Sequence, residues 1–150
     1  MLTVTKIVFF RKLSYICYVM NIDTLLLDKL TAEAKASPRL RMNLDLRNSA
    51  ADSSQRMLNA IEPGSVVPVH RHRGSSETLV VLRGRVVEEY YDSEGVCVAT
   101  YELAAGGPAF GLNIPAGQWH TLRALESGTV ILEMKDGAYE PISPADILSM

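Results

Sequence analysis

The sequence predicts an all-β domain, a sandwich or barrel of short strands, preceded by one short α-helix. Segments rich in Val, Ile, Leu and Tyr recur roughly every 8–12 residues, and Gly, Pro and Asp separate them. Only one segment has the periodicity of an amphipathic helix. With 150 residues and 47% hydrophobic content, the chain is long and apolar enough for one domain with a substantial core.

The helix is predicted over residues 24–36. Leucine and alanine recur there on one face, and Asp23 or Thr24 can cap the first turn. Ser37 and Pro38 follow directly, and a proline cannot continue a helix. The segment is therefore expected to pack its apolar face against the β domain.

The strands are predicted from alternation and from the turns between them. Over residues 40–46, Leu and Met alternate with Arg, Asn and Asp, which is typical of a half-buried strand. Asp92–Gly95 has the composition of a hairpin turn, and residues 144–148 predict one closing helical turn. The predicted strands are Leu40–Leu46, Gln55–Glu62, Val66–His72, Thr78–Leu82, Arg85–Tyr91, Val96–Leu103, Phe110–Ile114, His120–Leu125 and Thr129–Lys135.

All three histidines of the chain fall in two clusters. His70 and His72 are two residues apart, so a strand places both imidazoles on one face, roughly 6–7 Å apart along the chain. His120 follows the tight turn Pro115–Gly117 and has to come from a distant strand. A lone histidine in a strand is usually a surface or core residue. Here no histidine lies outside the two clusters, which favours a metal site.

Glu77 is the candidate oxygen ligand. An unbroken strand would turn it away from His72, because the two residues are an odd number of positions apart. Residues 73–76 are loop or bulge material, and one unpaired residue there restores the inward direction. The alternative is a solvated loop carboxylate. Together with His70, His72 and His120, Glu77 makes a donor set that suits one divalent transition metal ion, such as Fe, Mn, Ni, Co, Cu or Zn, and suits Ca or Mg poorly.

Two stretches resemble the sequence motifs of the cupin superfamily. The first motif is matched at every position by Gly64-x5-His70-x-His72-x4-Glu77-x6-Gly84. The core of the second motif is matched by Pro115-x-Gly117-x2-His120. The resemblance implies a single-domain cupin jelly-roll β-barrel, and it implies that the matched histidines and glutamate hold the metal.

The second motif departs from the cupin pattern at both of its ends. Ala109 stands where the family usually has a glycine, and Ala124 stands where it usually has an asparagine. That asparagine is not a ligand in the family, so the departure leaves the implied metal set intact.

A narrower resemblance connects the chain to the small WbuC-type cupin-fold metalloproteins. It covers nearly all of residues 20–150. That family is associated with O-antigen polysaccharide loci, which implies a carbohydrate setting but no established reaction. The stretches that carry the resemblance are Asn21–Ala36, Gln55–Ala60, Pro68–His72, Ile114–Thr121 and Glu133–Lys135.

Five further polar residues are candidates for the pocket or for contacts that orient the ligating imidazoles. Glu133 and Lys135 share one face of a predicted strand, as a proton donor and an anion clamp or as a surface charge pair. Arg56, Asn59 and Gln118 are candidates for hydrogen bonds to the metal ligands.

These observations lead to one expected function and several alternatives. We expect a metal-binding cupin that acts on or binds a small carbohydrate-derived molecule in polysaccharide (O-antigen) biosynthesis. As an enzyme it would be a metal-dependent sugar isomerase or epimerase, or a dioxygenase of small organic acids. The alternatives are a non-catalytic module that binds or senses a saccharide, and a structural zinc site with no open position.

The ends and the charge of the chain lead to the remaining expectations. Residues 1–19 are expected to be an N-terminal extension upstream of a true start at Met20, or an added strand at a sheet edge; residues 20–150 form the domain. The apolar runs of residues 1–19 are too short to span a bilayer.

The net charge of −2, without a basic block, does not suggest nucleic-acid binding. Cys17 and Cys97 match no CxxC pattern and indicate reduced thiols in a cytoplasmic protein. A homodimer is expected, with Asn21–Ala36 or the preceding stretch near the contact.

Overall fold

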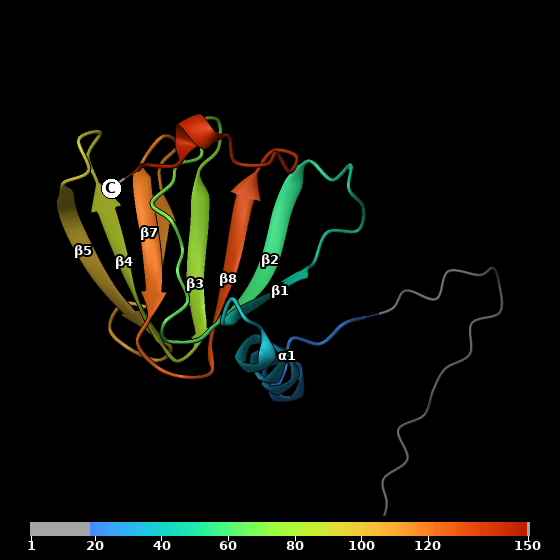
Figure 1. Cartoon of the computed structure of the whole chain (residues 1–150). Helices are drawn as coiled ribbons and strands as arrows, with labels where there is room; N and C mark the ends of the chain where they lie inside the picture. The colour runs from blue at the N-terminus through green and yellow to red at the C-terminus, as the bar shows by residue number, and fades with distance from the viewer. Residues whose placement is uncertain (1–18, 150) are drawn as a thin grey trace, which may run out of the picture.

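The computed structural model describes residues 19–149, which form two antiparallel β-sheets and one α-helix (Figure 1). The five-stranded sheet has the order β1-β2-β8-β3-β6, and the three-stranded sheet has the order β5-β4-β7. The predicted all-β architecture is confirmed. The strands are β1 (Arg41–Asp45), β2 (Ser54–Ile61), β3 (Glu77–Arg83), β4 (Arg85–Tyr91), β5 (Cys97–Ala104), β6 (Gly111–Ile114), β7 (Trp119–Ala124) and β8 (Thr129–Asp136).

The predicted extension at residues 1–19 lies almost wholly outside the described residues. Within residues 19–149, no helix is long and apolar enough to cross a membrane. A 3₁₀ turn, η1 (Pro144–Asp146), lies where the closing helical turn was predicted. It sits at the opposite end of the barrel from the helix α1 (Thr24–Ala36) (Figure 1).

The main core lies between the two sheets. The large sheet contributes side chains such as Leu79 and Ile131, and the small sheet contributes Val86, Leu103 and Leu122. These residues are at most 7% exposed, so their inward faces are sealed from water. Burial of this apolar surface is the main force that holds the sheets together.

A second core lies between α1 and the outer face of the large sheet. Leu27, Leu30 and Ala34 recur on one side of the helix and pack against Leu58 of β2 and Val130 of β8. The Asp23 side chain accepts a hydrogen bond of 3.0 Å from the Leu26 amide, which satisfies one of the free amides of the first turn. The helix and its cap therefore lie where the sequence predicts them.

One predicted strand is wrong. Val66–His72 is not a continuous strand, and only His70 pairs, with His120 and with Ile147. Pro68 has no amide hydrogen and cannot donate to a ladder, which is a physical reason for the irregular backbone. The other eight predicted strands agree with the observed ones to within one residue at each end.

The connection between β3 and β4 requires its glycine. Gly84 has a φ of 76°, and a Cβ atom there would lie 2.3 Å from Thr129 Oγ1 of the neighbouring strand β8. Any larger residue would push β8 away at the point where the chain passes from one sheet to the other. This explains the closing glycine of the first motif in this chain.

Candidate metal centre and its cavity

The three histidines meet at one point inside the barrel. His70 exchanges backbone hydrogen bonds of 2.9 and 2.8 Å with His120 of β7, and this pairing brings the two clusters together. The possible ligand atoms of His70, His72 and His120 all lie within 4.8 Å of one another. Ring centroids are 4.5 Å apart for His70 and His120 and 5.1 Å apart for His70 and His72. The sequence expectation that the three imidazoles converge is confirmed.

Two of the imidazoles are oriented by the backbone. Nδ1 of His70 lies 3.0 Å from the carbonyl oxygen of Pro68, and Nδ1 of His120 lies 2.9 Å from that of Gln118. A carbonyl can only accept, so both Nδ1 atoms carry the proton. Nε2 of each ring is then a free lone pair, which is the usual arrangement of metal-binding histidines.

Glu77 faces the same point from the first position of β3. Its side chain is buried, and Oε2 lies 3.4 Å from His72 Nε2 and 3.9 Å from His120 Nε2. The loop at residues 73–76 separates it from His72 and gives it the inward direction that the sequence predicted. The carboxylate therefore stands beside two of the three imidazoles.

The hydrogen bonding of these groups fits a metal ion. Among residues 19–149, the buried side-chain polar atoms without a hydrogen bond of regular geometry are His72 Nε2, both carboxyl oxygens of Glu88, and Glu77 Oε2, which has the Lys135 ammonium 3.1 Å away. Buried polar groups are normally satisfied, so the unpartnered Nε2 of His72, which lies 3.4 Å from Glu77 Oε2, needs an explanation. A cation between them would satisfy both, and imidazole nitrogens with one carboxylate form a transition-metal donor set.

The charge states of these groups also suit a cation. Burial and the neighbouring His120 lower the pKa of His70 to about 4, and burial lowers the pKa of His120. Both rings are therefore neutral at neutral pH, which is the form that binds a metal. Burial alone would raise the pKa of Glu77, but His72 and Lys135 outweigh it and lower that pKa, so the carboxylate is ionised.

Lys135 and Glu133 of β8 stand beside this cluster. Lys135 Nζ lies 3.1 Å from Glu77 Oε2 and 3.3 Å from Glu133 Oε2, so two carboxylates surround one ammonium group. Burial and the charge of Glu77 raise the pKa of Glu133 to about 7. Lys135 is neutralised by its own neighbours, which corrects the expectation that it serves as a free anion clamp. Glu133 keeps the property expected of a proton donor.

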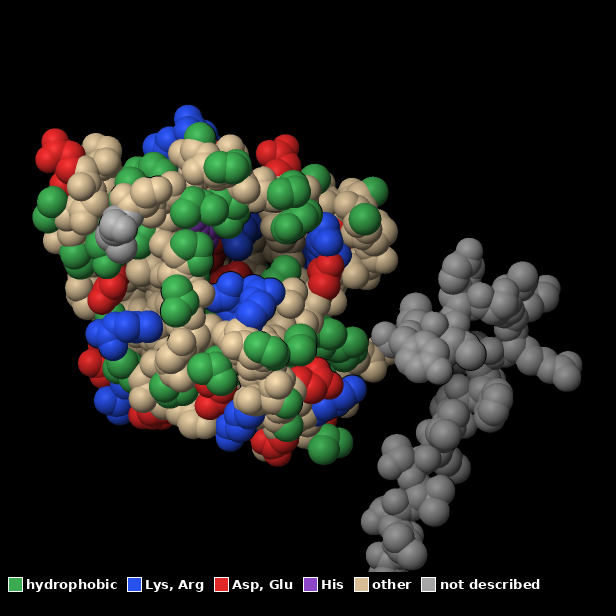
Figure 2. Space-filling model, viewed as in Figure 1, with side chains coloured by type: hydrophobic (Ala, Val, Ile, Leu, Met, Phe, Trp, Pro, Cys, Tyr) green, Lys and Arg blue, Asp and Glu red, His purple; other side chains and the backbone are tan. Residues whose placement is uncertain are grey.

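A cavity of about 420 Å³ opens beside the cluster. Figure 2 shows a hollow with histidine, acidic and basic side chains on its floor and further basic side chains at its rim. Asn59, Glu133 and Lys135 line it, as expected for pocket residues. Its volume is in the range of small-molecule sites.

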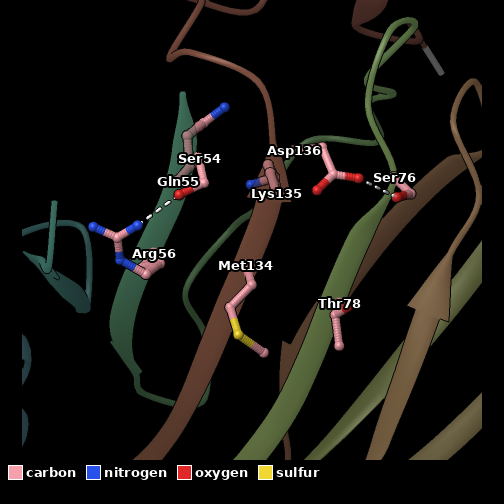
Figure 3. Close-up of a pocket in the computed structure, with 8 residues that line it drawn as sticks. All are labelled: Ser54, Gln55, Arg56, Ser76, Thr78, Met134, Lys135 and Asp136. Atoms are coloured by element: carbon pink, nitrogen blue, oxygen red, sulfur yellow. Dashed lines mark hydrogen bonds between the residues drawn. The ribbon is translucent and has the colours of Figure 1, made fainter. Parts of the chain in front are cut away.

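Arg56 does not join this cavity. It lies on the outer face of the large sheet, where it donates hydrogen bonds to Ser54 and Asp52 and lies opposite Met134 (Figure 3). Arg56 and Asn59 are three positions apart on one strand, so they cannot share a face. The expectation for Arg56 is therefore wrong at this site.

Gln118 contacts the cluster through its backbone. Its side-chain amide donates a hydrogen bond of 3.0 Å to the carbonyl oxygen of Tyr91, while its own carbonyl holds His120. The side chain therefore secures the turn before β7 and does not touch the imidazole.

Several residues of the cavity were not predicted from the sequence. Arg39, Arg41 and Asn43 line it, and none of them was predicted as a site residue. The apolar face of β1, with Met42 and Leu44, packs toward α1 on the outside of the barrel. The alternation of apolar and polar residues defines two faces of the strand but does not show which face points into the barrel. The one sequence feature that could have indicated a cavity here is the high density of polar side chains before and in β1. Glu88, which is buried and does not line the cavity, was also not predicted, since a carboxylate in a strand usually faces water.

Solved structures with a cupin fold are similar to this one over most of the chain. CapF from Staphylococcus aureus, a capsular polysaccharide assembling protein, aligns with a TM-score of 0.58 at 19% identity, over 70% of this chain and 30% of CapF. KdgF from Halomonas sp. aligns with a TM-score of 0.55 at 14% identity, over 69% of this chain and 84% of KdgF. A cupin 2 domain-containing protein from Halorhodospira halophila aligns with a TM-score of 0.54 at 17% identity, over 69% of this chain and 68% of that protein. The protein has a cupin fold.

Within that class the chain belongs to a defined sequence family. Residues 22–103 match the family described as "Domain of unknown function (DUF6016)". The aligned part spans less than a third of the CapF chain. No curated protein matches the sequence. The narrower resemblance to WbuC-type proteins stays a prediction.

Proposed function

We propose that the protein binds one divalent transition metal ion at His70, His72, Glu77 and His120, and that it acts on a small carbohydrate-derived molecule in the adjoining cavity. The observation that carries the proposal is the convergence of three imidazoles on a buried carboxylate, with Nε2 of His72 left without a hydrogen bond. Four protein ligands leave two positions free on an octahedral ion. The cavity beside them supports a site that is open to a ligand rather than a closed structural one.

The roles of the protein groups follow from their positions. The carbonyls of Pro68 and Gln118 hold the imidazoles of His70 and His120 in one tautomer, and Lys135 pairs with Glu77. Glu133, with a pKa of about 7, can take or give a proton at neutral pH. A bound ion would supply Lewis acidity toward an oxygen of the ligand. This combination suits isomerisation or epimerisation at a carbon next to a carbonyl group.

The carbohydrate part of the proposal rests on the cavity and on one relative. Gln55, Asn43 and Asn59 line the cavity, and their amides can donate and accept hydrogen bonds as sugar hydroxyls require. CapF, which shares the fold, is described as a capsular polysaccharide assembling protein. A role in polysaccharide biosynthesis in the cytoplasm is the setting that we propose for this chain.

The test compares metal binding by the wild-type protein with two variants. Glu77→Gln keeps the volume of the side chain but removes the anionic ligand, so metal affinity is expected to fall by about 10–100-fold and to recover in part with excess metal. His72→Ala removes an imidazole, and its metal affinity is expected to fall further than that of Glu77→Gln. Glu102→Gln, at an exposed carboxylate on β5, is the matched control and should bind like wild type.

Metal content and chelator competition are the measurements for these variants. If Glu77→Gln and His72→Ala bind metal as well as wild type does, the four residues are not its ligands. Turnover is measured separately, with metal-loaded protein and a panel of nucleotide sugars and sugar acids. Binding without turnover across that panel would favour a non-catalytic saccharide-binding module over an enzyme.

A further inference from the structure

Two arginines at the edge of the cavity differ from the other arginines of the structure. Arg39 lies two residues before β1 and Arg41 is the first residue of β1, and both line the cavity that contains the histidine cluster. The ion pairs of residues 19–149 include neither of them. Every other arginine in that range pairs with a carboxylate: Arg47, Arg56, Arg71, Arg73, Arg83, Arg85 and Arg123.

The two guanidinium groups also repel each other. Burial lowers the pKa of Arg41, and the positive charge of Arg39 lowers it further. Glu140 lines the same cavity but forms no ion pair with either arginine. Lys135, the other cation in the cavity, is already neutralised by Glu77 and Glu133. The uncompensated positive charge of the cavity is therefore concentrated at Arg39 and Arg41.

The backbone between them holds an unfavourable conformation. Leu40 has a φ of 54° and is, within residues 19–149, the one residue other than glycine with a positive φ. This conformation is uncommon for a bulky side chain and costs free energy. Hydrogen bonds of 2.9 Å from the Leu40 amide to Ser37 and from the Glu62 amide to Leu40 maintain it.

One hydrogen bond holds the backbone of Arg39, and another holds the side chain of Arg41. The Ser65 hydroxyl donates a hydrogen bond of 3.0 Å to the carbonyl oxygen of Arg39. Arg41 donates from one terminal nitrogen to the carbonyl oxygen of Val66, which fixes its side chain beside the segment that carries His70. The remaining donors of its planar group are free for a ligand. Such a group binds carboxylate or phosphate oxygens in pairs.

We propose that Arg39 and Arg41 form a binding site for the oxyanion group of an acidic ligand, a polyhydroxylated molecule that carries a carboxylate or a phosphate. The anionic group lies between the two guanidinium groups, and the hydroxylated part extends into the cavity toward the histidine cluster. The inference rests on the proposed function, because it assigns the substrate class of the same cavity. A neutral sugar would leave the two cations without a counterion.

The experiment measures binding of three probes to the metal-loaded protein by calorimetry. Glucuronate tests the carboxylate, glucose 6-phosphate tests the phosphate, and glucose is the neutral reference. At least one acidic probe is expected to bind more than 10-fold more tightly than glucose. The acidic probe with the higher affinity shows whether the site prefers a carboxylate or a phosphate. Wild-type protein that binds neither acidic probe more tightly than glucose overturns the proposal.

Variants then locate the binding site. The double variant Arg39→Gln/Arg41→Gln is expected to bind the preferred acidic probe with about 10–100-fold lower affinity, because charge-assisted hydrogen bonds are lost. Arg41→Lys keeps the charge but not the planar donor pair, so it is expected to lose part of the affinity. Arg41→Lys also tests the site if the double variant does not fold. Arg123→Gln, on the outer face of β7, is the control and should bind like wild type.

Metal stoichiometry separates the two proposals. If the arginine variants keep both their metal and their affinity for the acidic probe, the oxyanion site is wrong and the metal centre stands. If wild type takes up no metal, the metal centre fails, and acidic-probe binding that still depends on Arg39 and Arg41 supports the oxyanion site alone.

Discussion

Glu88 is the least expected residue of the interior. Its side chain is fully buried on β4, on the same face as Val86 of the main core, and neither carboxyl oxygen has a hydrogen-bond partner. Burial, together with the carboxylates of Glu77 and Glu133, raises the pKa of Glu88 to about 9. The side chain is therefore protonated in the folded protein at neutral pH, while in the unfolded chain it is ionised above its usual 4.5.

This difference predicts how the stability depends on pH. Between about pH 5 and pH 8 the folded state holds one more proton than the unfolded state at this position, so the free energy of unfolding falls as the pH rises. Glu88→Met removes the titration and both unsatisfied oxygens at similar length. Relative to this variant, wild type is expected to lose up to about 1.4 kcal/mol per pH unit in this range.

Urea unfolding of the metal-free protein at several pH values is the measurement. Glu102→Met, at an exposed position, is the control and should follow the wild-type curve. Parallel curves for wild type and Glu88→Met would show that Glu88 does not hold a proton that the unfolded chain releases.

At the scale of elements, the segment that carries His70 and His72 is held from two sides. His120 of β7 pairs with it on one side, and the C-terminal segment pairs on the other through Ile147. The Asp146 carboxylate accepts hydrogen bonds from Arg71 and Arg73, and Arg71 stacks 4.3 Å from the ring of Trp119. A segment without regular strand pairing therefore gains its position from its neighbours.

Asp146→Ala is expected to loosen this segment and to weaken metal binding. The side chain touches none of the candidate ligands, so the loss of affinity should stay below about 10-fold, less than for Glu77→Gln. Chelator competition measures it. Asp45→Ala removes an ion pair with Arg47 at an exposed position and is the control. Equal metal affinity in Asp146→Ala and wild type would show that β7 alone positions the histidines.

At the scale of the whole molecule, the main core is independent of the metal centre. It joins both sheets through apolar contacts that do not involve the histidines. Removing the metal is therefore expected to lower the melting temperature by about 5–10 °C from a state saturated at 100 times the dissociation constant, without unfolding the protein at 25 °C. Calorimetry with and without chelator checks it. An apo protein that is unfolded at 25 °C would mean that the ion is structural.

A homodimer remains a prediction for the assembled protein. Exposed apolar side chains gather at the start of α1, where Met20, Ile22 and Leu25 are 58%, 48% and 77% exposed. We expect the contact to include this region. Leu25→Asp should then shift the mass from dimer to monomer in light scattering, because a carboxylate in the first turn suits the helix but not an apolar contact. A monomeric mass for wild type would contradict the prediction.

The sequence was sufficient for most of the fold and for the residues that converge at the centre. Residues 24–36 and the alternating segments predict α1 and eight strands, because period and turn composition are local properties of the chain. His70, His72, Glu77 and His120 were found because their spacing follows from strand geometry and matches a recognisable motif. They converge because the segment that carries His70 pairs with the strand that carries His120.

Only the tertiary structure decided which face of each strand lines the cavity. β1 packs its apolar face against α1, so its polar face, with Arg41 and Asn43, lines the cavity. Alternation is symmetric between the two faces, and both faces of a strand between a helix and a cavity have a partner. The same limit misplaced Arg56, and burial of Glu88 depends on strands that lie far apart in sequence. The local sequence pattern determines where helices and strands form. Which charged side chains line the cavity depends on how these elements pack together.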